Sequence, residues 1–321
     1  MKCRICGSDQ ISTPLSVREM MIPTREVFDY FECANCHCLQ IWEIPDDLAA
    51  YYGPDYYSFQ TPVDKNAGRD NNAGRDNNAE NQEGKEHIIR DEHVQSAEHA
   101  RDTGHGAGDA ACGSVEWDMT PILDVGCGAG KFLQELRAIG YGNLKGCDPF
   151  LEKNITYGDE IHIYKRTIHE MDGVYEKIFM NDAFEHVTDP HEVMESIHRL
   201  LSPDGVARIA IPIYPNIAYD MVGADWYQLD APRHIFLHSR QSMELLAKAH
   251  GLRIVDVTYD ADPSQIFRSY LYSQDIPFWE QKMRMVLDDL GEAEVEEIEK
   301  LSNEANEKEY GDHAVFCLMK N

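Results

Sequence analysis

One stretch near the middle of the chain constrains the fold more than any other part of the sequence. An apolar run over 121–125 leads directly into three glycines at alternate positions, Gly126, Gly128 and Gly130, and a helical pattern follows over 131–139. Glycine lets a backbone approach a ligand closely, and the first turn of a helix presents free N–H groups to it. The stretch therefore predicts a buried strand, a ligand-binding turn and a helix.

The alternation of apolar runs with helical patterns continues to the C-terminal end. Runs typical of strands stand at 121–125, 144–147, 160–164, 177–180, 206–211, 253–257 and 313–320. Three helical patterns separate them, at 131–139, 190–201 and 240–250. Gly140 and Gly251 stand where the C-terminal glycine of a helix belongs. We therefore expect an α/β fold with a seven-stranded, mostly parallel sheet covered by helices on both faces. An acidic, exposed helix is expected over 292–309.

Two aspartates stand at the ends of neighbouring predicted strands. Asp124 comes before the glycines, and Asp148 ends the next strand, 18 residues after Gly130. An acid at the second position can accept hydrogen bonds from both ribose hydroxyls of a nucleotide-like ligand. The glycine spacing here is D-x-G-x-G-x-G, whereas a nicotinamide dehydrogenase carries G-x-G-x-x-G. The acid before the glycines suits an ammonium group, which a pyrophosphate lacks, so the sequence argues against a nicotinamide-dependent oxidoreductase.

Four of the nine cysteines form two pairs near the N-terminus, Cys3-x2-Cys6 and Cys33-x2-Cys36. Zinc takes four soft ligands in a tetrahedron, and each pair supplies two of them from one tight turn. Gly7 suits the turn after the first pair, while His37 and Cys38 follow the second pair and are less favoured ligands. We expect residues 1–60 to form a small zinc-ribbon-like module. Four thiolates fill every position around the metal, so this zinc should be structural.

Residues 61–115 differ in composition from the rest of the chain. The hexamer Asn-Ala-Gly-Arg-Asp-Asn stands at 66–71 and again at 72–77, and weaker copies follow in the same frame. The segment has too few apolar residues to bury a core, so we expect a low-complexity, disordered insert. It separates the module over 1–60 from a larger domain over 116–321.

The formal net charge of −28 argues against some classes of partner. A strongly acidic surface repels phosphate backbones and anionic lipid headgroups, so we expect neither a nucleic-acid nor a membrane partner. No apolar run is long enough to cross a bilayer, and the N-terminus has no secretory signal, so we expect a cytoplasmic protein. The sequence sets no oligomeric state.

The glycine stretch and the residues after later strands resemble class I S-adenosylmethionine-dependent methyltransferases. Residues 122–132 are similar to the family's first motif, and 181–190 to the motif after its fourth strand, which ends in E-H-V-x-D-P. The resemblance implies a Rossmann-like fold in which the glycines cradle the methionine part of the cofactor and Asp148 binds its ribose. The candidate cofactor-binding residues are Asp124, Gly126, Cys127, Gly128, Gly130, Asp148, Pro149, Asp182 and Ala183.

The two cysteine pairs, together with the aromatic run over 51–57, resemble the zinc-binding front end of a subgroup similar to the sugar C-methyltransferases. The loop over 226–239 is similar to the substrate-side loop after the fifth strand of that subgroup. His234 stands at the place of a histidine in that loop, and an imidazole titrates near neutral pH, as suits a general base. The other candidate catalytic residues are His186, Tyr227 and His238.

Further side chains of this region have expected roles around the two ligands. His186 is also expected to help shape the cofactor pocket. Trp226 and Tyr227 are expected to line the acceptor pocket, and the planar fork of Arg233 to hold an anionic acceptor.

These features indicate an enzyme that transfers a methyl group from S-adenosylmethionine to a small-molecule acceptor, and the resemblance suggests a sugar or surface-polysaccharide precursor. The expected cofactors are S-adenosylmethionine and Zn²⁺. Methyl transfer from a sulfonium is an in-line displacement, so the protein mainly aligns two reactants. The alternative is a non-catalytic zinc-containing binding protein built on a methyltransferase fold. Cofactor binding without turnover would distinguish it.

Overall fold

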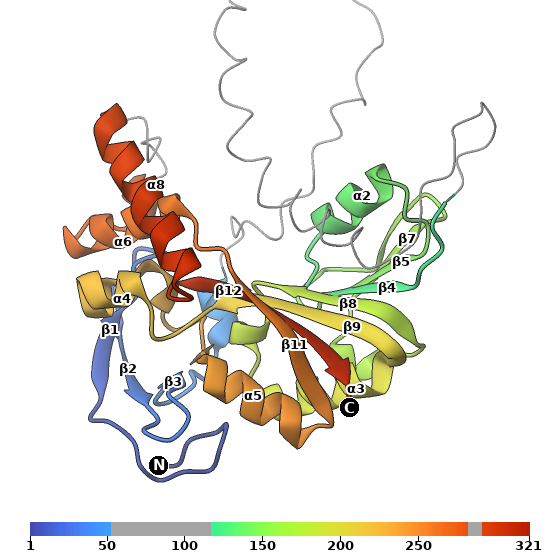
Figure 1. Cartoon of the computed structure of the whole chain (residues 1–321), viewed down its shortest axis with the longest axis horizontal. Coiled ribbons are helices and arrows are strands. Elements are labelled where there is room, and N and C mark those ends of the chain that lie inside the picture. The colour runs from blue at the N-terminus through green and yellow to red at the C-terminus, as the bar shows by residue number, and fades with distance from the viewer. Residues whose placement is uncertain (53–116, 282–290) are drawn as a thin grey trace, which may run out of the picture.

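The computed structural model describes residues 1–52, 117–281 and 291–321, and Figure 1 shows their arrangement. The predicted hexamer-repeat insert lies outside the described residues. Within them, the strands form a small four-stranded sheet and a larger eight-stranded sheet. None of the described helices is both long and apolar enough to cross a membrane.

The small sheet is antiparallel and belongs mainly to the N-terminal module. Its order is β1-β2-β3-β10, and the strands are β1 (Leu15–Arg18), β2 (Val27–Glu32), β3 (Leu39–Ile41) and β10 (Phe236–Leu237). The last strand comes from the far part of the chain, where Phe236 pairs with Gln40 and Leu237 with Leu39. The N-terminal module therefore shares its sheet with the loop that contains His234.

The large sheet has the order β11-β12-β9-β8-β4-β5-β7-β6. Its strands are β4 (Ile122–Val125), β5 (Leu144–Cys147), β6 (Ile155–Tyr157), β7 (Ile161–Tyr164), β8 (Tyr175–Asn181), β9 (Leu201–Pro212), β11 (Leu252–Tyr259) and β12 (His313–Lys320). The five strands from β9 to β7 run parallel, while β12, β11 and β6 are antiparallel to their neighbours. The expected α/β fold with a mostly parallel, Rossmann-like sheet is confirmed.

The predicted strand count is one too low. The sequence predicts seven strands, and β6 is the eighth, paired antiparallel with β7. The hairpin between them turns at Gly158, whose φ of +61° lies in the left-handed region that glycine enters readily. Ile155 and Tyr157 alternate with polar residues before this turn, so the sequence does carry the signal of a short edge strand.

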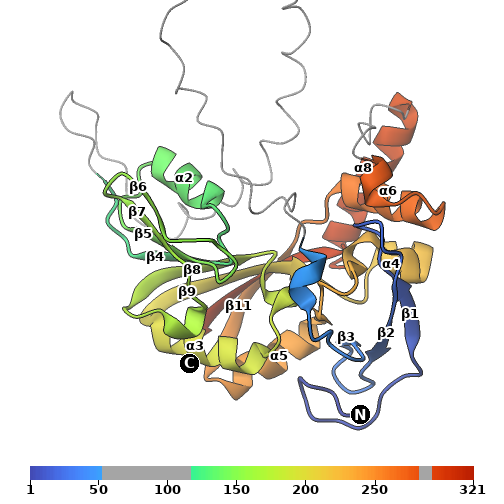
Figure 2. The ribbon, with the colours of Figure 1, turned by 180° about the vertical axis from the view of Figure 1, so that it is seen from behind.

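Helices cover both faces of the large sheet, as expected. They are α2 (Lys131–Ala138), α3 (Pro190–Leu200), α4 (Ile217–Val222), α5 (Arg240–Ala249), α6 (Pro263–Ser273), α7 (Phe278–Gln281) and α8 (Glu292–Glu307). Figures 1 and 2 show α2 on one face of the sheet and α3 with α5 on the other. Helices α4, α6 and α8 gather near the point where β12 begins. Gly140 and Gly251 have positive φ angles after α2 and α5, which confirms their predicted place.

The predicted acidic helix is α8, and one of its faces is anchored. Ser302 is fully buried and donates a hydrogen bond to the Ala261 carbonyl, and the Asn306 amide donates to the same oxygen. The expectation of an exposed helix therefore holds only for its outer side, where Glu296 and Glu299 are exposed.

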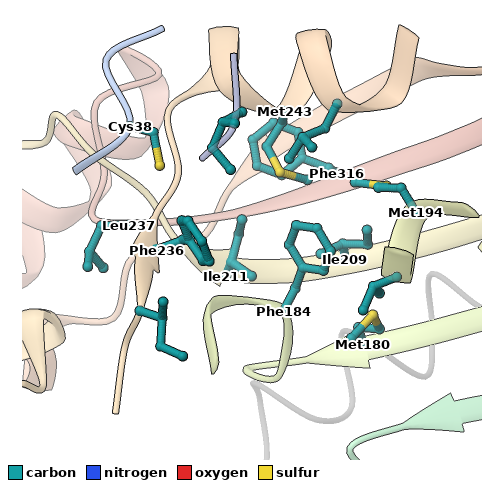
Figure 3. Close-up of a cluster of buried hydrophobic side chains, with 14 of the residues drawn as sticks. Cys38, Met180, Phe184, Met194, Ile209, Ile211, Phe236, Leu237, Met243 and Phe316 are labelled. Carbon is teal, nitrogen blue, oxygen red and sulfur yellow. The ribbon is translucent and has the colours of Figure 1, made fainter. Parts of the chain in front are cut away.

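A single hydrophobic core connects the α3–α5 face of the large sheet to the N-terminal module. Figure 3 shows its centre, where Phe184 lies close to Ile209 and Ile211 of β9, between Met180 and Phe236. Phe184 is fully buried, and it stands directly before Glu185 and His186. Burial of this ring fixes the backbone of the turn after β8, on which the candidate site depends.

Candidate functional site

The glycine turn after β4 adopts a backbone that only glycine takes without strain. Gly126, Gly128 and Gly130 have φ angles of +77°, +51° and +84°. A Cβ on Gly126 would lie 2.6 Å from the Ala183 Cβ, and one on Gly130 would lie 2.2 Å from the Ile163 Cδ1. The turn is therefore packed closely against the residues after β8 on one side and against β7 on the other.

The two predicted acids lie side by side at the carboxyl ends of β4 and β5. Asp148 accepts hydrogen bonds from the backbone N–H of Gly128 (3.0 Å) and of Phe150 (2.9 Å). Burial raises the pKa of Asp124 well above its usual value, and the neighbouring Asp148 carboxylate adds to the rise. The Asp148 carboxylate therefore ties the glycine turn to the strand beside it.

The other candidate cofactor residues surround this turn at the same edge of the sheet. The Cys127 sulfur lies 2.5 Å from where a Cβ on Gly146 would be, so this side chain packs onto β5. Pro149 is exposed after β5. Asp182 and Ala183 follow β8, and the Asp182 side chain is 52% exposed while it binds His313 at 3.0 Å. The structure brings all nine candidates to one edge, as the carboxyl ends of parallel strands require.

Beside the cofactor residues, two histidines and a glutamate gather around one point. His186 Nε2 lies 3.7 Å from the Glu185 Oε1, and His234 Nε2 lies 3.8 Å from the same oxygen. The two imidazole centroids are 4.7 Å apart. Glu185 is fully buried and His234 is 6% exposed. We call these three residues the Glu–His–His cluster.

Both imidazoles of the cluster donate hydrogen bonds to backbone carbonyl oxygens. His186 Nδ1 lies 3.0 Å from the Arg233 carbonyl oxygen, and His234 Nδ1 lies 2.7 Å from the Gln228 carbonyl oxygen. Burial lowers the pKa of His186 to about 3 and also lowers that of His234. Both rings are therefore neutral at pH 7, with their Nε2 atoms toward Glu185.

A tyrosine of the N-terminal module contacts His186 in this region. The Tyr52 hydroxyl lies 3.1 Å from His186 Nδ1, and its ring stacks on Phe150 with centroids 5.4 Å apart. Phe150 follows Asp148 by two residues, so Tyr52 links the cofactor side of the site to the Glu–His–His cluster. Burial raises the pKa of Tyr52 well above its usual value, which keeps the phenol protonated.

Several predicted acceptor-side residues lie away from the cluster. Arg233 is fully buried and donates to Asp230, to Glu19 (2.9 Å) and to the Tyr51 carbonyl (3.1 Å), so the expectation that it holds an anionic acceptor is wrong. Its guanidinium instead neutralises two buried carboxylates, which a buried arginine requires.

Trp226 and His238 are buried, and Tyr227 is half-buried against other side chains. Trp226 is 1% exposed and donates its indole N–H to Asp312, so it does not line a pocket. Tyr227 packs against Tyr272 and beneath Arg268, and burial raises its pKa to about 12, which makes it a poor base at neutral pH. His238 is fully buried and stacks on Phe184, 5.1 Å away, so it is a core histidine.

The four predicted zinc ligands come together at the tip of the N-terminal module. The Sγ atoms of Cys3 and Cys36 are 3.6 Å apart, those of Cys6 and Cys33 are 3.5 Å apart, and all four lie within 4.8 Å of one another. Four thiolates about 2.3 Å from a tetrahedral zinc would be about 3.8 Å apart, so the arrangement fits that ion.

The two cysteine turns are built alike. Gly7 follows the first pair at φ +72°, which confirms its predicted turn, and His37 follows the second at φ +56°. The His37 imidazole points to Glu32, 2.9 Å away, and Cys38 is buried 4.0 Å from His238. The two less favoured ligands therefore lie outside the sulfur cluster.

Glu185 and Tyr52 are the side chains at the candidate site that sequence reasoning does not assign to it. Glu185 stands in the E-H-V-x-D-P motif, and its acidic side chain before a histidine is a signal that points to it. Tyr52 gives no such signal, because its contact with His186 joins residues 134 positions apart.

Comparison of the sequence with protein families identifies a methyltransferase family. A family profile described as a methyltransferase domain matches residues 64–257, more than half of the chain. The C-methyltransferase NovU of Streptomyces niveus is 29% identical over 89 residues, covering 26% of this chain. The match spans only 19% of that relative's length.

The solved structures to which this chain is similar have low sequence identity and TM-scores below 0.5. A putative sarcosine dimethylglycine methyltransferase from Galdieria sulphuraria is 17% identical with a TM-score of 0.40, covering 64% of this chain and 79% of that one. A putative methyltransferase in complex with the Haloferax volcanii Trm112 methyltransferase activator is 18% identical with a TM-score of 0.43, covering 64% and 84%.

Proposed function

This chain belongs to the methyltransferase-domain family, as expected from its sequence, and we propose that it transfers a methyl group from S-adenosylmethionine to a small-molecule acceptor. The observation that carries the proposal is the glycine turn after β4, which is tied to Asp148 and packed against Ala183. The three segments meet at the carboxyl edge of the sheet, where open α/β folds bind their ligands.

The residues at this edge fit the parts of the proposed cofactor. When bound, S-adenosylmethionine supplies a methyl group already activated on a sulfonium. Gly126, Gly128 and Gly130 would hold its methionine part, because their backbone leaves room for close approach. Asp148 would accept from the ribose hydroxyls, and Asp124 would face the ammonium group. The exposed Pro149 and Asp182 would border the nucleoside.

The acceptor would bind beside the Glu–His–His cluster. The role proposed for this chain is to align the acceptor with the methyl group, which can be worth roughly 7–11 kcal/mol. Where the acceptor must lose a proton, His234 Nε2 would take it, because burial lowers the pKa of His234 and keeps its imidazole neutral. The acceptor class we favour is a sugar or a surface-polysaccharide precursor, because the loop over 226–239 resembles the substrate-side loop of the sugar C-methyltransferases.

The N-terminal module would hold one structural zinc ion through Cys3, Cys6, Cys33 and Cys36. The sulfur spacing fits this ion, and four thiolates leave no position open for a substrate. Backbone N–H groups of Ile5 and Asn35 point to two of the sulfurs at 3.4 Å, which stabilises thiolate charge.

Calorimetric titration with S-adenosylmethionine and S-adenosylhomocysteine tests the proposed cofactor site. Asp148→Ala should weaken binding by about 10-fold or more, because a hydrogen bond to a charged group contributes about 1.5–3 kcal/mol. Gly128→Val should also weaken binding, because a β-branched residue is strained at the φ of +51° and would distort the turn. Asp256→Ala, which removes an exposed acid on β11, is the charge-matched control and should bind as the wild type does. Unchanged affinity in both site variants would rule out the site.

The acceptor side has its own test. With an acceptor in hand, His234→Gln should lower turnover by about 10²-fold or more while cofactor affinity stays the same. An equal loss of cofactor affinity would make His234 a structural residue. Cofactor binding with no turnover for any acceptor would favour a non-catalytic binding protein.

A further inference from the structure

The Glu–His–His cluster contains a buried carboxylate that the described chain does not satisfy. Glu185 is 0% exposed, and among the described residues neither of its carboxylate oxygens has a hydrogen-bond partner. Buried polar groups in folded proteins are nearly always paired, and a buried charge needs a counter-charge or a metal. Within the described part of the chain, both oxygens of this buried carboxylate are therefore available to a cation.

The two histidines present their lone pairs to the same point. A carbonyl oxygen can only accept a hydrogen bond, so the close contacts of His186 and His234 with backbone carbonyls require the hydrogen on Nδ1 in both rings. The Tyr52 hydroxyl near His186 Nδ1 can accept as well, so it does not change this assignment. Each Nε2 therefore carries a lone pair. Metal-binding histidines are held in this way, with the other ring N–H donated to a backbone carbonyl or a carboxylate.

The distances suit an ion shared by three ligand atoms. The two Nε2 atoms lie 3.7 and 3.8 Å from the Glu185 Oε1, which is too long for a direct hydrogen bond. All three ligand atoms lie within 4.8 Å of one another. Ligands about 2.0–2.2 Å from a tetrahedral ion are about 3.4 Å apart, so a small contraction would complete the site.

Nearby positive charge does not oppose a cation here. The Arg233 guanidinium, whose carbonyl holds His186, is bonded to Glu19 at 2.9 Å and to Asp230 at 2.5 Å. These two carboxylates outweigh its single charge. Asp230 Oδ2 also lies 3.7 Å from His234 Nε2 and adds negative potential at the cluster.

We propose that Glu185, His186 and His234 bind one divalent transition-metal ion beside the acceptor. Two imidazoles and one carboxylate favour ions such as Zn²⁺, Fe²⁺ or Co²⁺ over Mg²⁺ and Ca²⁺, which prefer oxygen ligands throughout. Three protein ligands leave coordination positions open, to which an oxygen of the acceptor can bind. The ion's place in catalysis rests on the proposed function, but its binding does not.

A bound ion changes the role of His234. A ligand and a general base use the same lone pair, so His234 Nε2 serves one role at a time. With the ion in place, His234 holds the metal, and the acceptor oxygen is oriented and polarised by the metal.

Cobalt titration of the zinc-loaded full chain tests the site without cofactor or acceptor. One equivalent of zinc per chain is added first to fill the four-cysteine site, and Co²⁺ binding is then followed by visible absorption. We expect about one further equivalent, with d–d bands and no thiolate-to-cobalt charge-transfer band. Glu185→Gln, His186→Ala and His234→Ala should each weaken Co²⁺ binding by at least about 10–100-fold, the range already seen on loss of outer-shell partners.

A control and a folding check accompany the titration. His250→Gln removes one member of the His191–His250 pair, whose nitrogens lie 2.9 Å apart, and should leave cobalt binding unchanged. Glu185→Gln keeps the side-chain volume, and the thermal transition of each variant reports its fold. The proposal is overturned if the wild type takes up no further equivalent, if the His250 variant loses it, or if the three cluster variants keep it. Failure of S-adenosylmethionine binding would refute the proposed function and leave this result standing.

Discussion

Gly126→Ala adds one methyl group where the glycine turn touches the turn after β8. The new Cβ would lie 2.6 Å from the Ala183 Cβ. Non-bonded carbons are comfortable at about 3.5–4.0 Å, so the two turns must separate by roughly 1 Å. The φ of +77° adds strain of about 1–2 kcal/mol for any L-residue. Overpacking costs a further ~1–3 kcal/mol. We expect a total loss of about 2–5 kcal/mol in the free energy of unfolding.

The loss of stability should be accompanied by a loss of cofactor affinity, because the separated turns hold the candidate cofactor residues. We expect the affinity for S-adenosylhomocysteine to fall at least ~10-fold, which equals about 1.4 kcal/mol. Urea unfolding and calorimetric titration measure the two effects. Gly7→Ala is the matched control, since Gly7 has a φ of +72° and its added Cβ would meet no atom within 4 Å. It should show only the strain and bind the ligand normally.

A compensating change separates the contact from the strain. Ala183→Gly removes the carbon that the new Cβ would meet, so the Gly126→Ala, Ala183→Gly double variant should recover about 1–3 kcal/mol of stability together with the affinity. The reasoning is refuted if Gly126→Ala and Gly7→Ala lose equal stability, or if the two changes in the double variant are simply additive.

Three further predictions concern the module and the buried charges. Metal analysis of the purified protein should find about one equivalent of zinc in the four-cysteine site, and Cys33→Ser with Cys36→Ser should lower the zinc content by that equivalent. An unchanged zinc content in this double variant would exclude the site. Arg233→Met should lower the free energy of unfolding in urea by about 3–5 kcal/mol, because it leaves two acids without a counter-charge. Glu19→Gln should lower it less, because Arg233 keeps its ion pair with Asp230. A larger loss for Glu19→Gln than for Arg233→Met would contradict this pairing of charges. Two carboxylates raise the pKa of His313 well above its usual value. The stability that the charged imidazole contributes to the fold is therefore complete below about pH 6.5 and is lost as the pH rises through the folded-state pKa. The stability difference between the wild type and His313→Asn should therefore shrink in alkaline solution, and a difference that grows with pH would be inconsistent with the ion pairs.

The parts of the fold that follow from local periodicity are predictable from the sequence. The seven expected strands all appear, because each is an apolar run of strand length bounded by turn residues. The glycine turn is equally clear, since three alternate glycines between a strand and a helix are typical of a turn that approaches a ligand. By contrast, α6 is not among the predicted helices, although Asp262 and Pro263 form a regular helix start, with the Asp262 side chain accepting from the Ser264 N–H.

The composition of the acceptor side does not follow from the sequence. A rich set of polar and aromatic residues in the loop after β9 suggests one pocket, but the structure divides them between the site and the core. Arg233 and Trp226 donate hydrogen bonds to the buried carboxylates of Glu19 and Asp312. His234, in contrast, faces Glu185. Burial decides between the two uses of a polar side chain, and for Arg233 it depends on contact with Glu19, 214 positions away in the sequence.

The N-terminal module is part of the framework of the site, because it holds the loop that carries His234. The Tyr30 hydroxyl, fully buried in the module, donates to the His234 carbonyl at 2.8 Å, and Glu19 binds the neighbouring Arg233. The N-cap serine of α5 donates to the Cys36 carbonyl, so the second cysteine turn also contacts the end of this loop. Each of these groups is buried, and a buried donor or acceptor that loses its partner destabilises the fold by about 1–3 kcal/mol. A metal ion that fixes the cysteine turns would therefore also fix the backbone of His234, although it touches neither reactant.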